Sequence, residues 1–188
     1  MNRDQAWQLV CENVESVALR QHMLSVEAAM RTYSEIMGGD ADTWGIVGLL
    51  HDFDYERWPE PPAHTREGAA ILRDRGVDEE TIGAIMSHAE WNHEQYPLDR
   101  PIRKALTAVD ELCGFVYAVA LVRPTRLDGM EPSSVKKKLK ATQFAAAVSR
   151  ANIHRGAELV GWTLDEHIEN CIRAMQGVAG EIGLKLGT

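Results

Sequence analysis

Several histidines and carboxylates of this chain lie in or beside strongly apolar sequence. His51 and Asp52 directly follow residues 44–50, the most apolar segment, and Asp110 lies inside another apolar segment. An ionised carboxylate buried beside an imidazole needs a partner, and a divalent cation satisfies both groups. Three further histidines lie on or beside segments with an apolar face. The six candidate metal ligands are therefore His22, His51, Asp52, His64, His88 and Asp110.

Each of the six residues also has an ordinary structural explanation. A single buried histidine is usually a hydrogen-bonded core residue. Asp110 can pair with a lysine or an arginine, and an adjacent pair such as His51-Asp52 occurs by chance in many proteins. These explanations need a separate partner for each residue, whereas one metal centre satisfies all six. Helices packed around a core can direct inward-facing ligands to one place, so we expect the six to converge.

The elements that position these residues are predicted to be helices. Apolar residues recur at steps of three and four over residues 23–37, and Gly38-Gly39 ends this helix. Asp40 or Asp42 caps a short buried helix that contains residues 44–50. Further helices are expected over 63–75, over 79–89 after the capping Asp78, over 101–122, from Pro132 or Ser133, and after a capping Asp165.

The predicted fold class is therefore all-α, with about eight helices in a single domain over residues 1–188. The metal-binding core is expected at about residues 20–122, with C-terminal helices over 132–185 packed on it. Valine, isoleucine and threonine never alternate with polar residues as in a strand. Pro59, Pro61 and Pro62 predict a surface loop. His154 and His167 are assigned ordinary surface or capping roles.

Composition limits the possible partners. The chain has 188 residues and a formal net charge of −8, which disfavours nucleic-acid polymers and anionic membranes. A small phosphorylated substrate remains compatible if bound metal reverses the local field. The three cysteines, Cys11, Cys113 and Cys171, form neither a disulfide framework nor a thiolate zinc motif. Residues 1–10 are too polar for a signal peptide, so we expect a cytoplasmic protein.

The order His22, His51-Asp52, Asp110 resembles the HD-domain superfamily of metal-dependent phosphohydrolases, which has an all-α fold. The resemblance covers about residues 20–122, and His64 and His88 match two further histidines of its two-metal subset. Residues 134–140 and 144–150 are similar to stretches of uncharacterised HD hydrolases. Four motifs strengthen the resemblance: Leu49–Asp52, Ala63–Ala69, Ile85–Glu90 and Thr107–Leu112.

The resemblance implies a dinuclear site in a single HD domain. His22, His51, Asp52 and Asp110 would hold one ion, and His64 and His88 a second, with Asp52 bridging. Ligands of nitrogen and oxygen alone fit divalent transition metals such as Fe, Mn, Ni, Co or Zn. The implied activity is cleavage of a small phosphoester or nucleotide by a metal-activated hydroxide, with Asp52 and His51 as the catalytic residues.

Two departures from motifs of the superfamily narrow the range of expected substrates. Cyclic-dinucleotide phosphodiesterases of the superfamily carry Gly-Tyr-Pro downstream of the second extra histidine, but this chain has Gln95-Tyr96-Pro97. The mononuclear 5′-nucleotidase type has a glutamate three residues after the HD aspartate, where this chain has Tyr55. Asp54 and Glu56 beside it are interpreted as residues of a solvated loop.

Positive side chains are candidates for binding the substrate, although for any single one of them a solvated helix face is the better explanation. Trp91 and Tyr96 are further candidates at the entrance. The substrate-binding candidates are Arg123, Lys137, Lys138, Arg150 and His93, with Lys136 and Lys140 nearby.

Two other functions fit the same ligand set. Some HD-fold proteins with six ligands use a mixed-valent di-iron centre to oxygenate a substrate. A non-catalytic HD module that binds a nucleotide is the third possibility, although a pure binder has no chemical need for the metal ligands.

Overall fold

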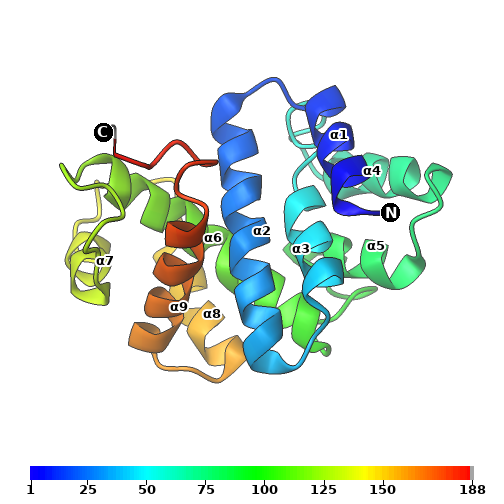
Figure 1. Cartoon of the computed structure of the whole chain (residues 1–188). Coiled ribbons are helices and arrows are strands. Elements are labelled where there is room, and N and C mark those ends of the chain that lie inside the picture. Colours follow the sequence, from blue (N-terminus) through cyan, green and yellow to red (C-terminus); the bar gives the residue numbers. More distant parts are fainter. Residues whose placement is uncertain (187–188) are drawn as a thin grey trace.

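The computed structural model describes residues 1–186, and within them the chain is helical with no β-strand (Figure 1). These described residues form nine α-helices and one short 3₁₀ helix, which confirms the predicted all-α class. The elements are α1 (Arg3–Asn13), α2 (Val17–Met37), α3 (Ala41–Leu50), α4 (Ala63–Asp74), α5 (Glu79–Met86), η1 (Glu90–Asn92), α6 (Pro101–Leu121), α7 (Pro132–Leu139), α8 (Arg150–Val160) and α9 (Leu164–Gly177).

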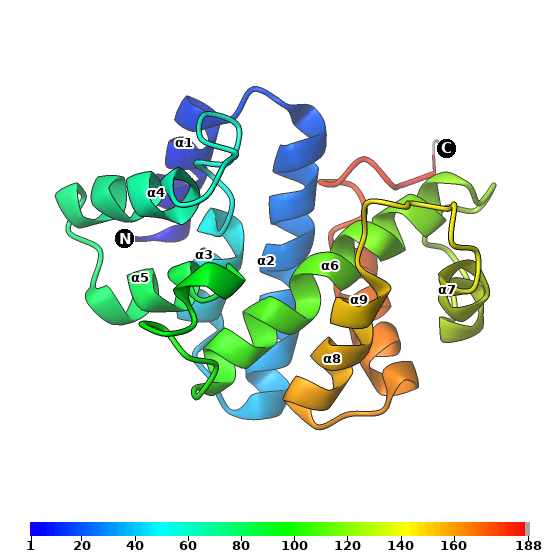
Figure 2. The same ribbon diagram turned by 180° about the vertical axis from the view of Figure 1, so that it is seen from behind.

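The two longest helices, α2 and α6, cross at the middle of the molecule (Figure 2). Helix α3 packs along α2, and α1, α4 and α5 lie on the same side of the molecule, while α7, α8 and α9 lie on the other (Figure 1). Met30 of α2, Leu50 of α3 and Leu112 of α6 are fully buried in the shared core. The helices that carry the candidate ligands are therefore held against one another by this core.

Two glycines allow helices to approach closely near the candidate ligands. A Cβ atom at Gly48 of α3 would lie 2.9 Å from the Val26 carbonyl oxygen of α2. A Cβ atom at Gly156 of α8 would lie 2.9 Å from the Ala108 carbonyl oxygen of α6. Real side chains do not tolerate these distances, so glycine is required for α3 to pack on α2 and for α8 to pack on α6.

Most predicted helix ends are confirmed. Gly38 ends α2 in the left-handed conformation (φ 77°), and Asp40 caps α3 by accepting a hydrogen bond from the Thr43 amide. Asp78 caps α5, which ends at Met86 rather than at residue 89, with Ser87 as its C-cap. The prediction that Asp165 caps the last helix is wrong.

Thr163 caps α9 instead, together with Glu166 in a reciprocal capping box that satisfies two backbone amides. His167 follows in the first turns of this helix, but its side chain is fully buried rather than at the surface. The sequence analysis also missed α1 and α8 as separate helices. Both begin with a capping side chain, Asn2 for α1 and Ser149 for α8.

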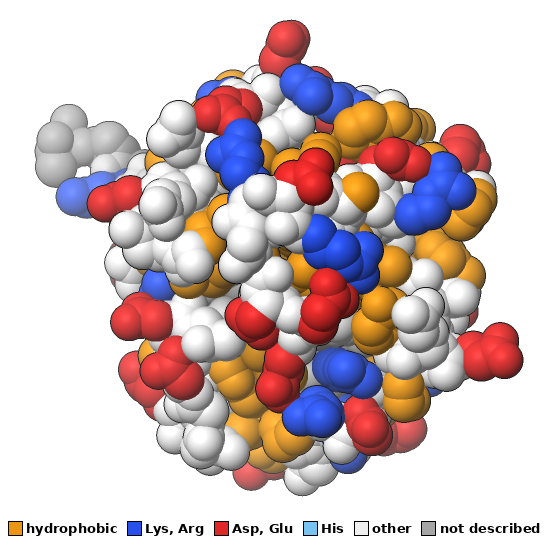
Figure 3. Space-filling view, turned by 90° about the vertical axis from the view of Figure 1, so that its right-hand side faces the viewer, with side chains coloured by type: hydrophobic (Ala, Val, Ile, Leu, Met, Phe, Trp, Pro, Cys, Tyr) orange, Lys and Arg blue, Asp and Glu red, His pale blue; other side chains and the backbone are white. Residues whose placement is uncertain are grey.

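The surface mixes charges of both signs. The face shown in Figure 3 has Lys and Arg side chains next to Asp and Glu, with small apolar areas between them. Surface ion pairs such as Arg73–Glu79 (2.7 Å) and Arg75–Glu12 (2.9 Å) show the same interspersion. Within residues 1–186, every helix is too short or too polar to cross a membrane.

Candidate metal centre

Two of the candidate histidines are held in place by hydrogen bonds from their Nδ1 atoms to backbone oxygens. His51 Nδ1 donates to the Gly48 carbonyl oxygen (2.8 Å), and His88 Nδ1 donates to the Ile85 carbonyl oxygen (2.7 Å). Because a carbonyl oxygen only accepts hydrogen bonds, Nδ1 carries the proton in both rings. When either ring is neutral, its Nε2 atom therefore has a free lone pair, as a metal ligand requires.

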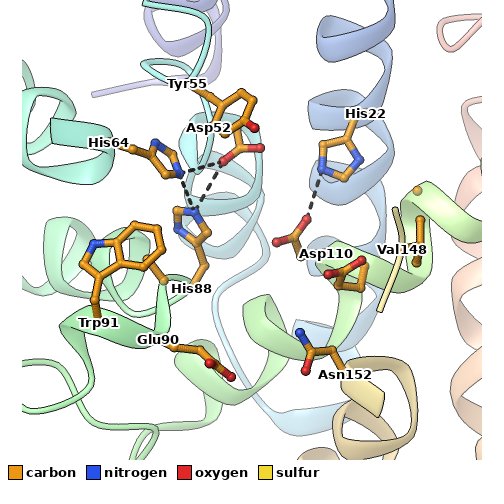
Figure 4. A pocket seen from close by; sticks show the side chains of 13 residues that line it. His22, Asp52, Tyr55, His64, His88, Glu90, Trp91, Asp110, Val148 and Asn152 are labelled. Carbon is orange, nitrogen blue, oxygen red and sulfur yellow. Dashed lines mark hydrogen bonds and ion pairs between the residues drawn. The ribbon is translucent and has the colours of Figure 1, made fainter. Parts of the chain in front are cut away.

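The first cluster contains His22, His51, Asp52 and Asp110. His51 is 1% exposed, and its Nε2 atom has no hydrogen-bond partner within residues 1–186. This atom lies 3.5 Å from Asp52 Oδ2 and 3.5 Å from Asp110 Oδ1. His22 Nε2 lies 3.1 Å from the same Asp110 oxygen (Figure 4). A buried nitrogen lone pair that faces two carboxylates is explained by a cation between them.

The second cluster contains Asp52, His64 and His88, which Figure 4 shows facing one another. The Nε2 atoms of His64 and His88 are 3.2 Å apart, and Asp52 Oδ1 lies 3.4 Å from the first and 3.3 Å from the second. Two imidazole lone pairs at this distance repel unless a proton or a metal ion lies between them. Asp52 directs Oδ2 toward the first cluster and Oδ1 toward the second.

The donor atoms are suited to divalent metal. Within each of two groups, His22–His51–Asp52 and Asp52–His64–His88, potential ligand atoms lie within 4.8 Å of one another. All of these atoms are nitrogen or oxygen, and imidazole favours transition metals over magnesium or calcium. The structure thus brings all six residues named from the sequence to one place, and they fit a metal centre.

The charges of the site are mutually stabilising. Burial opposes ionisation of Asp52, but the charge of His51 and hydrogen bonds from His64 and His88 hold its pKa well below the usual value. Burial also lowers the pKa of His64, but hydrogen bonds to Asp52 and Asp54 outweigh it and raise that pKa to about 9. The carboxylates therefore stay ionised, and the site favours positive charge.

Asp54 is a residue whose role the sequence analysis missed. It is 1% exposed, so its interpretation as part of a solvated loop is wrong. Its Oδ1 atom accepts a hydrogen bond from His64 Nδ1 (3.0 Å), which leaves His64 Nε2 facing Asp52. Glu56 is exposed as expected and accepts hydrogen bonds from the amides of residues 15 and 16. A carboxylate that fixes the tautomer of a ligand histidine is a common support of metal sites.

Asp54 also fixes the backbone around His64. Its Oδ2 atom accepts hydrogen bonds from the amides of Thr65 (2.8 Å) and Gly68 (3.0 Å). Thr65 has φ 71°, in the left-handed region that threonine rarely adopts, so the start of α4 is not helical at residues 64 and 65. Asn92 donates to Thr65 Oγ1 (2.9 Å) and to the Met86 carbonyl oxygen (2.8 Å). This side chain therefore links the segments that carry His64 and His88.

A cavity of about 520 Å³ opens in front of the clusters. Five of the six candidate ligands line it, while His51 lies buried beneath. Tyr55 and Trp91 form part of its wall, with ring centroids 5.1 and 6.0 Å from that of His64. His93 is outside the lining, where its Nε2 atom bonds to the Ser87 carbonyl oxygen (2.9 Å), and Tyr96 is outside it as well.

The predicted basic substrate-binding residues also lie outside the cavity lining. Arg123 donates to the backbone oxygens of residues 126 and 128. Arg150 donates to the carbonyl oxygens of residues 144, 145 and 148 and stacks on Phe115. Lys138 lies 4.7 Å from the ring centroid of Phe144, and Lys136 pairs with Asp165. The structure brings neither these side chains nor Lys137 to the cavity. The two arginines stabilise turns instead.

These observations define an all-helical protein in which clustered histidines and aspartates could hold metal. A sequence model of the family described as the HD domain matches residues 19–142, a span that contains all six candidate ligands. The chain therefore belongs to the HD domain family, which is part of a superfamily of metal-dependent hydrolases. Searches of curated proteins and of solved structures return no match.

Proposed function

We propose that this chain is a metal-dependent phosphohydrolase that cleaves a small phosphoester with two divalent transition-metal ions. The observation that carries the proposal is the convergence of imidazole Nε2 atoms on the two oxygens of Asp52 at the floor of an open cavity. His22, His51, Asp52 and Asp110 would hold one ion, and Asp52, His64 and His88 the other. Bound ions of this kind acidify water and offset the charge of a phosphoryl group.

Residues around the candidate ligands fix the orientation of the imidazole rings. The Gly48 and Ile85 carbonyl oxygens fix the rings of His51 and His88, and Asp54 fixes the ring of His64. These hydrogen bonds hold the ligand atoms in position, which lowers the reorganisation cost of the reaction. Tyr55 and Trp91 flank the side of the cavity next to His64.

Glu111 is the candidate proton donor to the leaving oxygen. Its side chain lines the cavity next to Asp110, and its Oε2 atom accepts a hydrogen bond from the Ser149 amide (3.2 Å). In the metal-free chain, burial and the charge of Asp110 raise the pKa of Glu111. Donation of a proton from Glu111 would let the leaving group depart as an alcohol.

The proposal is tested with a panel of phosphomonoesters and phosphodiesters in the presence of Mn²⁺ or Ni²⁺. We expect phosphate release that Asp52→Asn abolishes and that Asp74→Asn, at an exposed position on α4, leaves unchanged. Dioxygen uptake and a mixed-valent di-iron signal without phosphate release would instead identify an oxygenase. Tight nucleotide binding without any turnover would identify a binding module.

A further inference from the structure

One wall of the cavity comes from outside the region that matches the HD domain. The candidate metal ligands all lie within residues 19–142, whereas Val148 and Asn152 line the cavity from just before α8 and from its first turn. Gly156 seats α8 directly on α6, the helix that carries Asp110. Figure 4 shows Asn152 on the same side of the cavity as Glu90, below His88 and Asp110. This part of the chain therefore adds its own features to the site.

A side lobe of about 90 Å³ extends the cavity between α6 and α8. It shares five residues with the main cavity and adds three, Thr107, Arg155 and Leu159, to the lining; the shared residues are His88, Glu90, Asp110, Glu111 and Asn152. The Thr107 Oγ1 atom is buried and has no hydrogen-bond partner within residues 1–186. A buried hydroxyl without a partner is costly, so a ligand hydroxyl that comes within hydrogen-bond distance of Oγ1 would stabilise it.

The charges around the lobe disfavour a second phosphate group. Among residues 1–186, those that line the main cavity include no lysine or arginine. Arg155 is the cation of the side lobe, and it is paired with Glu90 at 3.1 Å. Glu111 adds a further carboxyl group to both linings. A phosphate group in the lobe would therefore meet the carboxylates of Glu90 and Asp110 and an arginine that is already paired.

We propose that the side lobe binds an uncharged, hydroxyl-bearing part of the substrate, so that the substrate is a compact polyol or sugar monophosphate. This inference rests on the proposed phosphohydrolase function. The Asn152 amide and the Thr107 hydroxyl each donate and accept hydrogen bonds, as a substrate hydroxyl also does. An ammonium group only donates and a phosphate dianion only accepts, so each would satisfy these two residues less well. Asn152 and Thr107 act here as specificity residues.

The first test compares matched substrates in the Mn²⁺-loaded protein. Glycerol 1-phosphate and propyl phosphate have the same carbon chain with and without hydroxyl groups. We expect kcat/KM to be at least about tenfold higher for glycerol 1-phosphate, since buried polar groups left unpaired disfavour the analogue without them. Ribose 5-phosphate is likewise expected to exceed adenosine 5′-triphosphate by about tenfold or more.

The second test assigns these preferences to residues. Asn152→Ala should reduce the preference for glycerol 1-phosphate over propyl phosphate to below about threefold, mainly through KM. His154→Ala, at an exposed position of α8, should leave the preference intact. Glu90→Gln should raise the kcat/KM ratio of adenosine 5′-triphosphate to ribose 5-phosphate by about threefold, and the exposed control Glu158→Gln should not.

Binding gives a readout that is independent of turnover. The phosphonate analogue of glycerol 1-phosphate, titrated calorimetrically, should bind Asn152→Ala about tenfold more weakly than the unaltered chain. Equal kcat/KM for glycerol 1-phosphate and propyl phosphate, or equal or better cleavage of the triphosphate, would overturn this inference and leave the phosphohydrolase function standing. Absence of phosphate release from every ester would overturn both.

Discussion

Two buried regions of this protein contain histidine, and their surroundings differ. In the core, His167 of α9 places Nδ1 2.7 Å from the Tyr33 hydroxyl, and burial lowers its pKa to about 4. In the metal centre, His51 and His88 are also buried, but neighbouring carboxylates overcome the effect of burial and raise the pKa of each ring. Burial alone thus does not indicate a ligand, whereas a fixed Nδ1 with carboxylates facing Nε2 does.

The largest expected effect follows from the residue that the two clusters share. Asp52→Asn removes the negative charge that both groups share and replaces one of the two ligand oxygens with an amide nitrogen, so we expect loss of both bound ions and phosphate release no faster than without enzyme. Elemental analysis and the phosphoester panel check the two parts separately. Asp74→Asn provides the matched control, and an active, metal-bound Asp52→Asn protein would contradict the assignment.

The core histidine predicts an acid-sensitive fold. Between pH 6.5 and about 4 the unfolded chain binds a proton that folded His167 does not, so the free energy of unfolding should fall by about 3 kcal/mol over this range. His167→Asn keeps a hydrogen-bonding group near Tyr33 and should remove this contribution. Chemical denaturation at several pH values measures the difference, with His154→Asn as the exposed control. An unchanged slope in His167→Asn would show that His167 is not its source.

The histidines of the metal centre should show the opposite dependence. In the metal-free chain, the raised pKa of His64 stabilises the fold below pH 6.5, and this contribution is lost as the pH rises through about 9. Metal must displace the His64 proton, so metal affinity should fall by about tenfold per pH unit below 9. Calorimetric titrations in buffers of different ionisation enthalpy measure this proton release. Affinity that does not change between pH 6 and 8 would contradict the prediction.

Variants of Asp54 distinguish a residue that positions a metal ligand from a residue that binds the metal itself. Asp54→Asn should weaken metal binding at the Asp52–His64–His88 group by about 10- to 100-fold and leave the other group loaded. Metal titration followed by elemental analysis distinguishes the two groups, and Glu56→Gln is the control in the same loop. Restoration of the second ion by Asp54→Glu would indicate that the carboxylate acts by positioning His64. Equal weakening at both groups would indicate a general structural role.

The smallest expected effect concerns the basic residues predicted to bind substrate. Lys137 lies outside the cavity lining, so Lys137→Ala should change kcat/KM by less than about twofold at low salt, since only long-range screened attraction remains. Steady-state kinetics on the best substrate of the panel measure this, with Glu158→Gln as a surface control of opposite charge. A tenfold loss of kcat/KM that is confined to Lys137→Ala would show that Lys137 contributes to substrate binding.

The sequence predicted the helices and the six candidate ligands because both leave local signals. Periodic apolar residues and capping side chains mark the helices, and His51-Asp52 stands out against its apolar neighbours. Asp54 and Asn152 leave no such signal. Asp54 acts through a residue ten positions away, and Asn152 reaches the cavity only because Gly156 lets α8 pack on α6. The burial of His167 likewise depends on Tyr33, 134 residues earlier in the chain.

The central claim, that two groups of ligands share Asp52, is tested most directly by elemental analysis of protein purified without added metal. We predict two transition-metal ions per chain in the unaltered protein and one in His64→Ala and in His88→Ala. His154→Ala should retain both ions. Unchanged stoichiometry in the two site variants would show that His64 and His88 are not ligands and would contradict the shared centre.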